Sequence, residues 1–90
     1  MHYEFCTNVI VEDKNPSKVY LRNIETGKHT ALKDKTKIAI ILELNKNKQA
    51  SVEQIANNLN IDQSRIKSLF RDLAKRNFLF DNSKAYELFD

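Results

Sequence analysis

Hydrophobic and polar residues alternate in the first third of the chain, which is the period expected of half-buried strands. The apolar positions between residues 2 and 12 are Tyr3, Phe5, Val9 and Val11. This alternation predicts one strand or two short ones. Residues 19–24 and 29–32 predict two more, joined by a tight turn in which Gly27 can take a positive φ. We therefore expect an N-terminal antiparallel hairpin or three-stranded sheet.

The pattern changes to a helical one after Lys33. Helical spacing separates the hydrophobic residues Ile38, Ile41 and Leu42. The buried face of this helix is widened by Ile40 and Leu44. Asp34 or Thr36 can cap the start of this helix. Its polar flanks favour a well-buried helix over a strand.

The stretch from Ser51 to Phe70 predicts two helices around a tight turn. Ser51 followed by Gln54 makes a capping box, and the apolar positions Val52, Ile55, Ala56 and Leu59 form one helical face. Asn60 tolerates the left-handed conformation that ends helices, and Asp62 can cap the next one. A capped two-turn helix, a turn and a longer helix are therefore predicted.

The longer helix is expected from about Gln63 to Arg76. Its apolar face consists of Ile66, Leu69, Phe70, Leu73 and Ala74. At about 100° per residue, the residues that point the opposite way are Ser64, Ser68, Arg71 and Lys75. Lys67 flanks this outward face on one side, and Arg65 and Arg76 flank it on the other. The tail predicts a hairpin, because Phe78 and Phe80, then Tyr86 and Leu88, alternate around a turn at residues 81–84.

Composition narrows the function classes. The 90 residues form a single domain with 41% hydrophobic and 30% charged residues, one cysteine and a net charge of +3. His2 and His29 have no acid or cysteine at useful spacing, so we expect no enzyme, no metal site and no cofactor. No segment approaches the roughly 20 apolar residues that a membrane helix needs. These features predict a cytoplasmic protein, and the positive charge permits a nucleic-acid partner.

The segment "SVEQIANNLNIDQSRIKSLFRDLAKRNFLF", followed by "DNSKAYEL", resembles the winged helix-turn-helix domain over residues 35–89. The resemblance implies a winged helix at residues 34–90 after the N-terminal sheet of residues 1–33. It also implies that the third helix enters the major groove and that the hairpin, or wing, lies on the backbone. By position, the resemblance implies that nucleic acid is bound by Gln63, Ser64, Lys67, Ser68, Arg71 and Lys84. Lys75 is added as a phosphate anchor.

The implied function is that of a small DNA-binding protein, either a transcriptional regulator or a replication accessory factor. Double-stranded DNA is the expected ligand, because single-strand binding would need exposed aromatics. The candidates for that role are Tyr3, Tyr20 and Tyr86, each also typical of a strand.

A second resemblance leaves a different function open. "VYLRNIETGKHTAL" followed by three helices is similar to the PqqD-like leader-peptide recognition fold, over about residues 3–80. This family implies capture of a peptide on the edge of the N-terminal sheet. A protein-binding winged helix is a third alternative. Homodimerisation through the N-terminal strands or the first helix also stays open.

Overall fold

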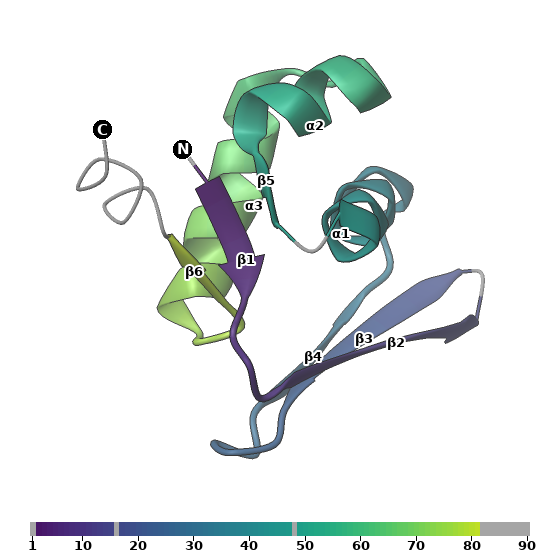
Figure 1. The fold of residues 1–90 in the computed structure, drawn as a ribbon. Coiled ribbons are helices and arrows are strands. Elements are labelled where there is room, and N and C mark those ends of the chain that lie inside the picture. Colours follow the sequence, from purple (N-terminus) through teal and green to yellow (C-terminus); the bar gives the residue numbers. More distant parts are fainter. Residues whose placement is uncertain (1, 16, 48, 82–90) are drawn as a thin grey trace.

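The computed structural model describes residues 2–15, 17–47 and 49–81, and this part of the chain has the predicted α+β class (Figure 1). Its three helices are α1 (Lys35–Asn47), α2 (Val52–Leu59) and α3 (Gln63–Lys75). Asp34 begins α1, since its carboxylate accepts a hydrogen bond from the Lys37 backbone N–H at 3.0 Å. Among the described residues, no helix combines the length and the hydrophobicity needed to span a bilayer.

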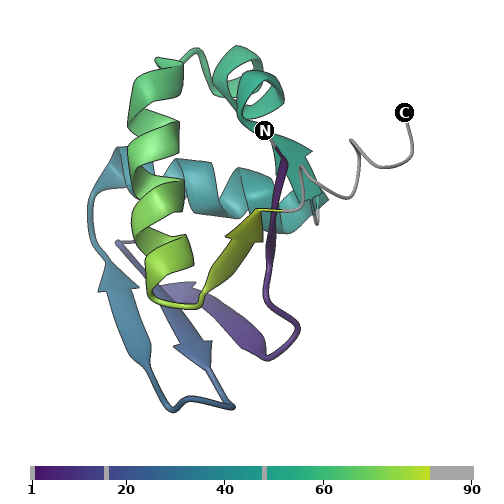
Figure 2. The same ribbon diagram turned by 90° about the vertical axis from the view of Figure 1, so that its left-hand side faces the viewer.

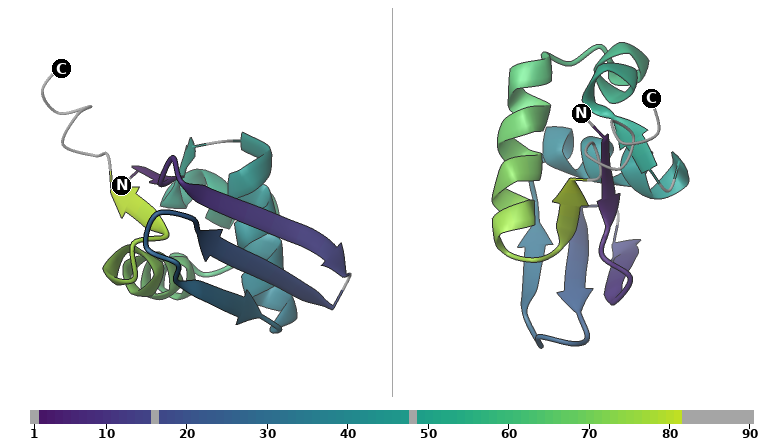
Figure 3. Two further views of the ribbon diagram at one scale, coloured as in Figure 1. Left: turned by 90° about the horizontal axis from the view of Figure 1, so that it is seen from below. Right: turned by 60° about the vertical axis from the view of Figure 1, so that its left-hand side comes forward.

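The N-terminal sheet forms as predicted from three antiparallel strands. They are β2 (Val9–Asn15), β3 (Lys18–Asn23) and β4 (His29–Leu32), with β3 in the centre. Gly27 lies in the turn between β3 and β4 at a φ of +75°, which confirms the reason for a glycine there. The sheet lies against α1, with its other face turned outward (Figure 3).

The first strand was expected in this N-terminal sheet, and that assignment is wrong. Strand β1 (His2–Phe5) instead lies between β5 (Gln49–Ser51) and β6 (Leu79–Asp81) in a second antiparallel sheet. Tyr3 is paired with Ala50 on one side and Asp81 on the other. Strand β5 lies in the short connection between α1 and α2, and its backbone pairs with β1. Strand β1 therefore joins two segments that are distant from it in sequence.

The strand after α3 differs in detail from its prediction. Phe78 is buried just before β6, whereas Phe80 within β6 is 40% exposed, so the two do not share a buried face. Leu79 takes the inward position instead. The wing turn and its second strand, at residues 82–90, lie outside the described residues.

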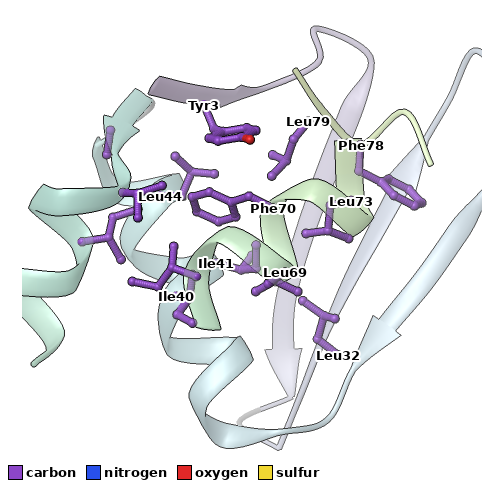
Figure 4. Close-up of a cluster of buried hydrophobic side chains, with 14 of the residues drawn as sticks. Tyr3, Leu32, Ile40, Ile41, Leu44, Leu69, Phe70, Leu73, Phe78 and Leu79 are labelled. Atoms are coloured by element: carbon purple, nitrogen blue, oxygen red, sulfur yellow. The ribbon is translucent and has the colours of Figure 1, made fainter. Parts of the chain in front are cut away.

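The helices and both sheets share one hydrophobic core. Phe70 of α3 lies near its centre, with its ring centroid 5.1 Å from that of Tyr3 and the planes tilted by 55° (Figure 4). Such tilted pairs add to the gain from burial. The fully buried side chains around them include Ile40, Ile41, Leu44, Ile66, Leu73, Phe78 and Leu79. The Tyr3 side chain thus anchors β1 on α3.

One buried polar residue connects two turns. Asn23, at the end of β3, accepts hydrogen bonds from the backbone N–H groups of Glu25 and Thr26 at 3.0 and 3.1 Å. Its side-chain nitrogen donates to the Asn77 carbonyl at 2.8 Å, and Asn77 has a φ of +67°. The turn after α3 is therefore fixed to the β3–β4 hairpin, and the buried amide is satisfied.

Candidate nucleic-acid interface

Local capping sets the corner between α2 and α3. The capping box is present in full: the Ser51 hydroxyl accepts from the Gln54 backbone N–H at 3.1 Å, and the Gln54 side chain accepts from the Ser51 N–H at 3.0 Å. Asn60 ends α2 in the left-handed conformation, with a φ of +55°. Asp62 then caps α3 through the Ser64 backbone N–H at 3.1 Å. These contacts confirm the predicted capped helix, turn and longer helix, and they fix the direction in which α3 leaves the turn.

Helix α3 presents the predicted outward face at one side of the molecule (Figure 2). The side chains on this face or beside it are Gln63, Ser64, Ser68, Arg71 and Lys75, which are exposed, and Lys67, which is half-buried. On the opposite side, Ile66, Phe70 and Leu73 are fully buried. The structure therefore brings together the candidate residues of α3. Lys84 lies outside the described residues.

The flank of α3 that faces β1 and β6 carries mixed charges. A hydrogen bond from its own backbone N–H lowers the pKa of Glu53, in the first turn of α2, and the positive charge of Lys67 lowers it further. Arg71 acts electrostatically on Tyr3, as does Asp81 of β6. Two carboxylates thus accompany the cations on this flank.

The opposite flank contains an ion pair that the sequence analysis did not assign. Arg76, which ends α3, lies 2.7 Å from the Asp72 carboxylate and donates to the Thr30 hydroxyl of β4 at 3.2 Å. Its guanidinium carbon also lies 5.7 Å from the centroid of the Phe78 ring. The i, i+4 spacing of Asp72 and Arg76 is the signal that would have suggested the pair. Asp72, the acid nearest to the outward face, is therefore paired with a cation.

The ionisation of Tyr3 should report on this packing. Burial raises the pKa of its phenol, and the Asp81 carboxylate raises it further, while the Arg71 cation opposes both effects. The neutral phenol therefore stabilises the fold below the ordinary tyrosine pKa of about 10, and this contribution is lost as pH rises through the higher folded-state value. We expect tyrosinate absorbance to show one late-ionising component in the folded protein.

Tyr3→Phe keeps an aromatic ring against Phe70 but has no phenol. We expect the late component to disappear in this variant. We also expect its free energy of unfolding to fall less steeply above pH 10 than that of the wild type. Titration curves of the same shape in the two proteins would contradict the assignment.

Metal-ligating side chains and one thiol are spread across the described ranges. No group of three or more His, Cys, Asp or Glu side chains in the described ranges is arranged to hold a metal ion. Burial raises the pKa of the Cys6 thiol, which disfavours the reactive thiolate at neutral pH.

Comparisons with known proteins do not extend this description. The chain matches no protein-family model, and no curated protein or solved structure is significantly similar to it. A functional assignment therefore rests on the residues and geometry of the chain itself.

Proposed function

We propose that the chain is a small winged-helix protein that binds nucleic acid, with α3 in the major groove of double-stranded DNA. The observation that carries this proposal is the outward face of α3. Arg71 and Lys75 project from it together with two serine hydroxyls, and it lies directly opposite the buried Phe70. A rigid helix with an uncovered polar and basic face has the shape and the chemistry that groove binding needs.

The dimensions of α3 suit this role. An α-helix with its side chains is about 10–12 Å across, which fits the major groove width of about 12 Å. At 1.5 Å per residue, the 13 residues of α3 extend about 20 Å along the groove. Arg71 and Lys67 can donate to guanine edges or to phosphates, and Gln63 can address adenine. This chemistry suits a transcriptional regulator or a replication accessory factor.

Duplex DNA is favoured over a single strand as the ligand. Tyr3, one of the aromatic candidates for base stacking, is only 3% exposed and packs on Phe70. Tyr20 is exposed but belongs to β3, in the other sheet from β1. Neither of these two tyrosines therefore provides a stacking platform on the basic helical face, and the exposed aromatic side chain on β6 is Phe80, at 40%.

A salt titration tests the proposal. We expect a fluorescently labelled, mixed-sequence duplex to bind more tightly than either of its single strands. If Lys67, Arg71 and Lys75 each neutralise one phosphate, log K should fall against log salt with a slope of about −2.7, which weakens binding roughly 40-fold between 50 and 200 mM salt. Absence of duplex binding at 50 mM salt would contradict the proposal.

Peptide capture is the second candidate function, and the position of β4 favours it. Within the described residues β4 pairs only with β3, so its outer edge has backbone groups for an added strand. Arg76 of α3 reaches Thr30 on β4, which places the end of the helix beside this edge. The PqqD-like resemblance implies the same mode. Binding that depends weakly on salt and perturbs the backbone amides of β4 would favour this function.

A further inference from the structure

A hollow of about 350 Å³ lies beside the outward face of α3, on the side of α1. Its lining residues are Lys37, Arg65, Ser68, Leu69 and Asp72. Lys37 comes from the first turn of α1, and the other four come from α3. Leu69 is buried, and Ser68 belongs to both the hollow and the outward face. A ligand on the outward face could therefore continue into the hollow.

The charges in the hollow are unbalanced. Its single carboxylate, that of Asp72, is paired with Arg76 at 2.7 Å. Across the part of the chain that the structure describes, the side chains of Lys37 and Arg65 form no ion pair or hydrogen bond. Asp34 lies near Lys37 in sequence, but it accepts from the backbone N–H of that residue. The hollow thus presents two uncompensated cations and a hydroxyl.

We infer that this hollow seats a phosphate of the DNA backbone when α3 occupies the major groove. The inference rests on the proposed function. It adds that the phosphate backbone of one DNA strand is bound on the α1 side of α3. A guanidinium, an ammonium and a hydroxyl are suitable donors for the oxygens of one phosphate diester. The hollow therefore adds a phosphate contact on the side of α3 that faces α1.

The test compares two charge-matched double variants of the full chain. Lys37→Ala with Arg65→Ala removes both cations of the hollow. Lys28→Ala with Lys46→Ala removes two exposed cations outside it, from the β3–β4 turn and the last turn of α1. All four side chains are exposed, and circular dichroism checks that each variant folds. Binding of the same labelled duplex is measured at several salt concentrations.

We expect the hollow variant to bind the duplex about tenfold more weakly at 100 mM salt, with a salt slope shallower by about one. Its preference between two duplex sequences should be unchanged, because a phosphate contact does not read bases. The control variant should retain most of the wild-type affinity. An unchanged slope in the hollow variant, with wild-type binding intact, would overturn the inference and leave the proposed function standing. Failure of the wild type to bind duplex would overturn both.

Two other ligands could bind the same cations, and each is tested in a separate titration. Inorganic phosphate and a glutamate-rich peptide are titrated into the labelled protein while backbone and side-chain resonances of Lys37 and Arg65 are followed. Saturation by either ligand at low millimolar concentration, without competition against the duplex, would overturn the inference in favour of a small-anion or acidic-peptide site. If inorganic phosphate displaces the duplex only at high phosphate concentration, and the peptide does not displace it, the result supports a phosphate site in the hollow.

Discussion

Phe70→Ala is expected to cost about 3–5 kcal/mol in free energy of unfolding. Phe70 is fully buried on α3, and its ring packs against Tyr3 of the central strand β1. Removing the ring leaves a cavity where α3 meets the sheet of β5, β1 and β6, and it also removes the tilted aromatic contact. A small domain has only about 5–15 kcal/mol of stability, so the variant should unfold at much lower urea concentration. Circular dichroism during urea unfolding measures the loss.

Phe80→Ala provides the matched control. Phe80 lies in β6, also beside β1, but it is 40% exposed. We expect a loss of about 1–2 kcal/mol, smaller than at Phe70, because the Phe80 ring is already partly in water and its removal leaves no closed cavity. Phe70→Leu, which keeps part of the volume, gives a measurable intermediate if Phe70→Ala does not fold. Equal losses at Phe70 and Phe80 would contradict the core described for α3.

Lys67→Ala combined with Arg71→Ala should weaken duplex binding about 100-fold at 100 mM salt, which corresponds to roughly 2.7 kcal/mol. Both side chains lie on or beside the outward face of α3. Each substitution removes one contact to a phosphate or a guanine. The slope of log K against log salt should therefore also become shallower by up to about two. Fluorescence anisotropy with the labelled duplex measures both quantities.

The Lys28→Ala, Lys46→Ala protein again serves as the control, because it loses the same net charge from other surfaces. Arg71→Lys separates the two contributions, since lysine keeps the charge but lacks the guanidinium fork that pairs with guanine. Loss of sequence preference in Arg71→Lys would indicate base reading by Arg71. Duplex affinity unchanged in the Lys67, Arg71 double variant would contradict groove binding through α3.

Local signals predicted α2, α3 and their corner well. The Ser51 and Gln54 capping box, the left-handed Asn60 and the Asp62 cap each depend on residues a few positions apart. Hydrophobic periodicity likewise predicted the outward face of α3, because one helix determines which side chains share a face. Gly27 and the β3–β4 turn followed from the same local chemistry.

Contacts between distant segments could not be predicted in this way. Tyr3 and Phe5 alternate with polar neighbours much as Val9 and Val11 do, yet β1 joins β5 and β6 while β2 joins β3. Alternation specifies a strand and its buried face without specifying the partner. Arg65 was placed on the flank of α3, but the hollow also needs Lys37, which only the packing of α1 brings beside it. The pairing of Arg76 with Thr30 was missed for the same reason.

The central position of β1 has a consequence for the order in which the protein folds. During synthesis β1 emerges before every other described element, and its partner β6 emerges after all of them. The hairpins of β2, β3 and β4 need only neighbouring segments, so they can form while later residues are still being added. The sheet that supports α3 can close only when the chain has been made as far as β6. The helix with the candidate interface should therefore gain its fixed orientation late, after the N-terminal sheet has formed.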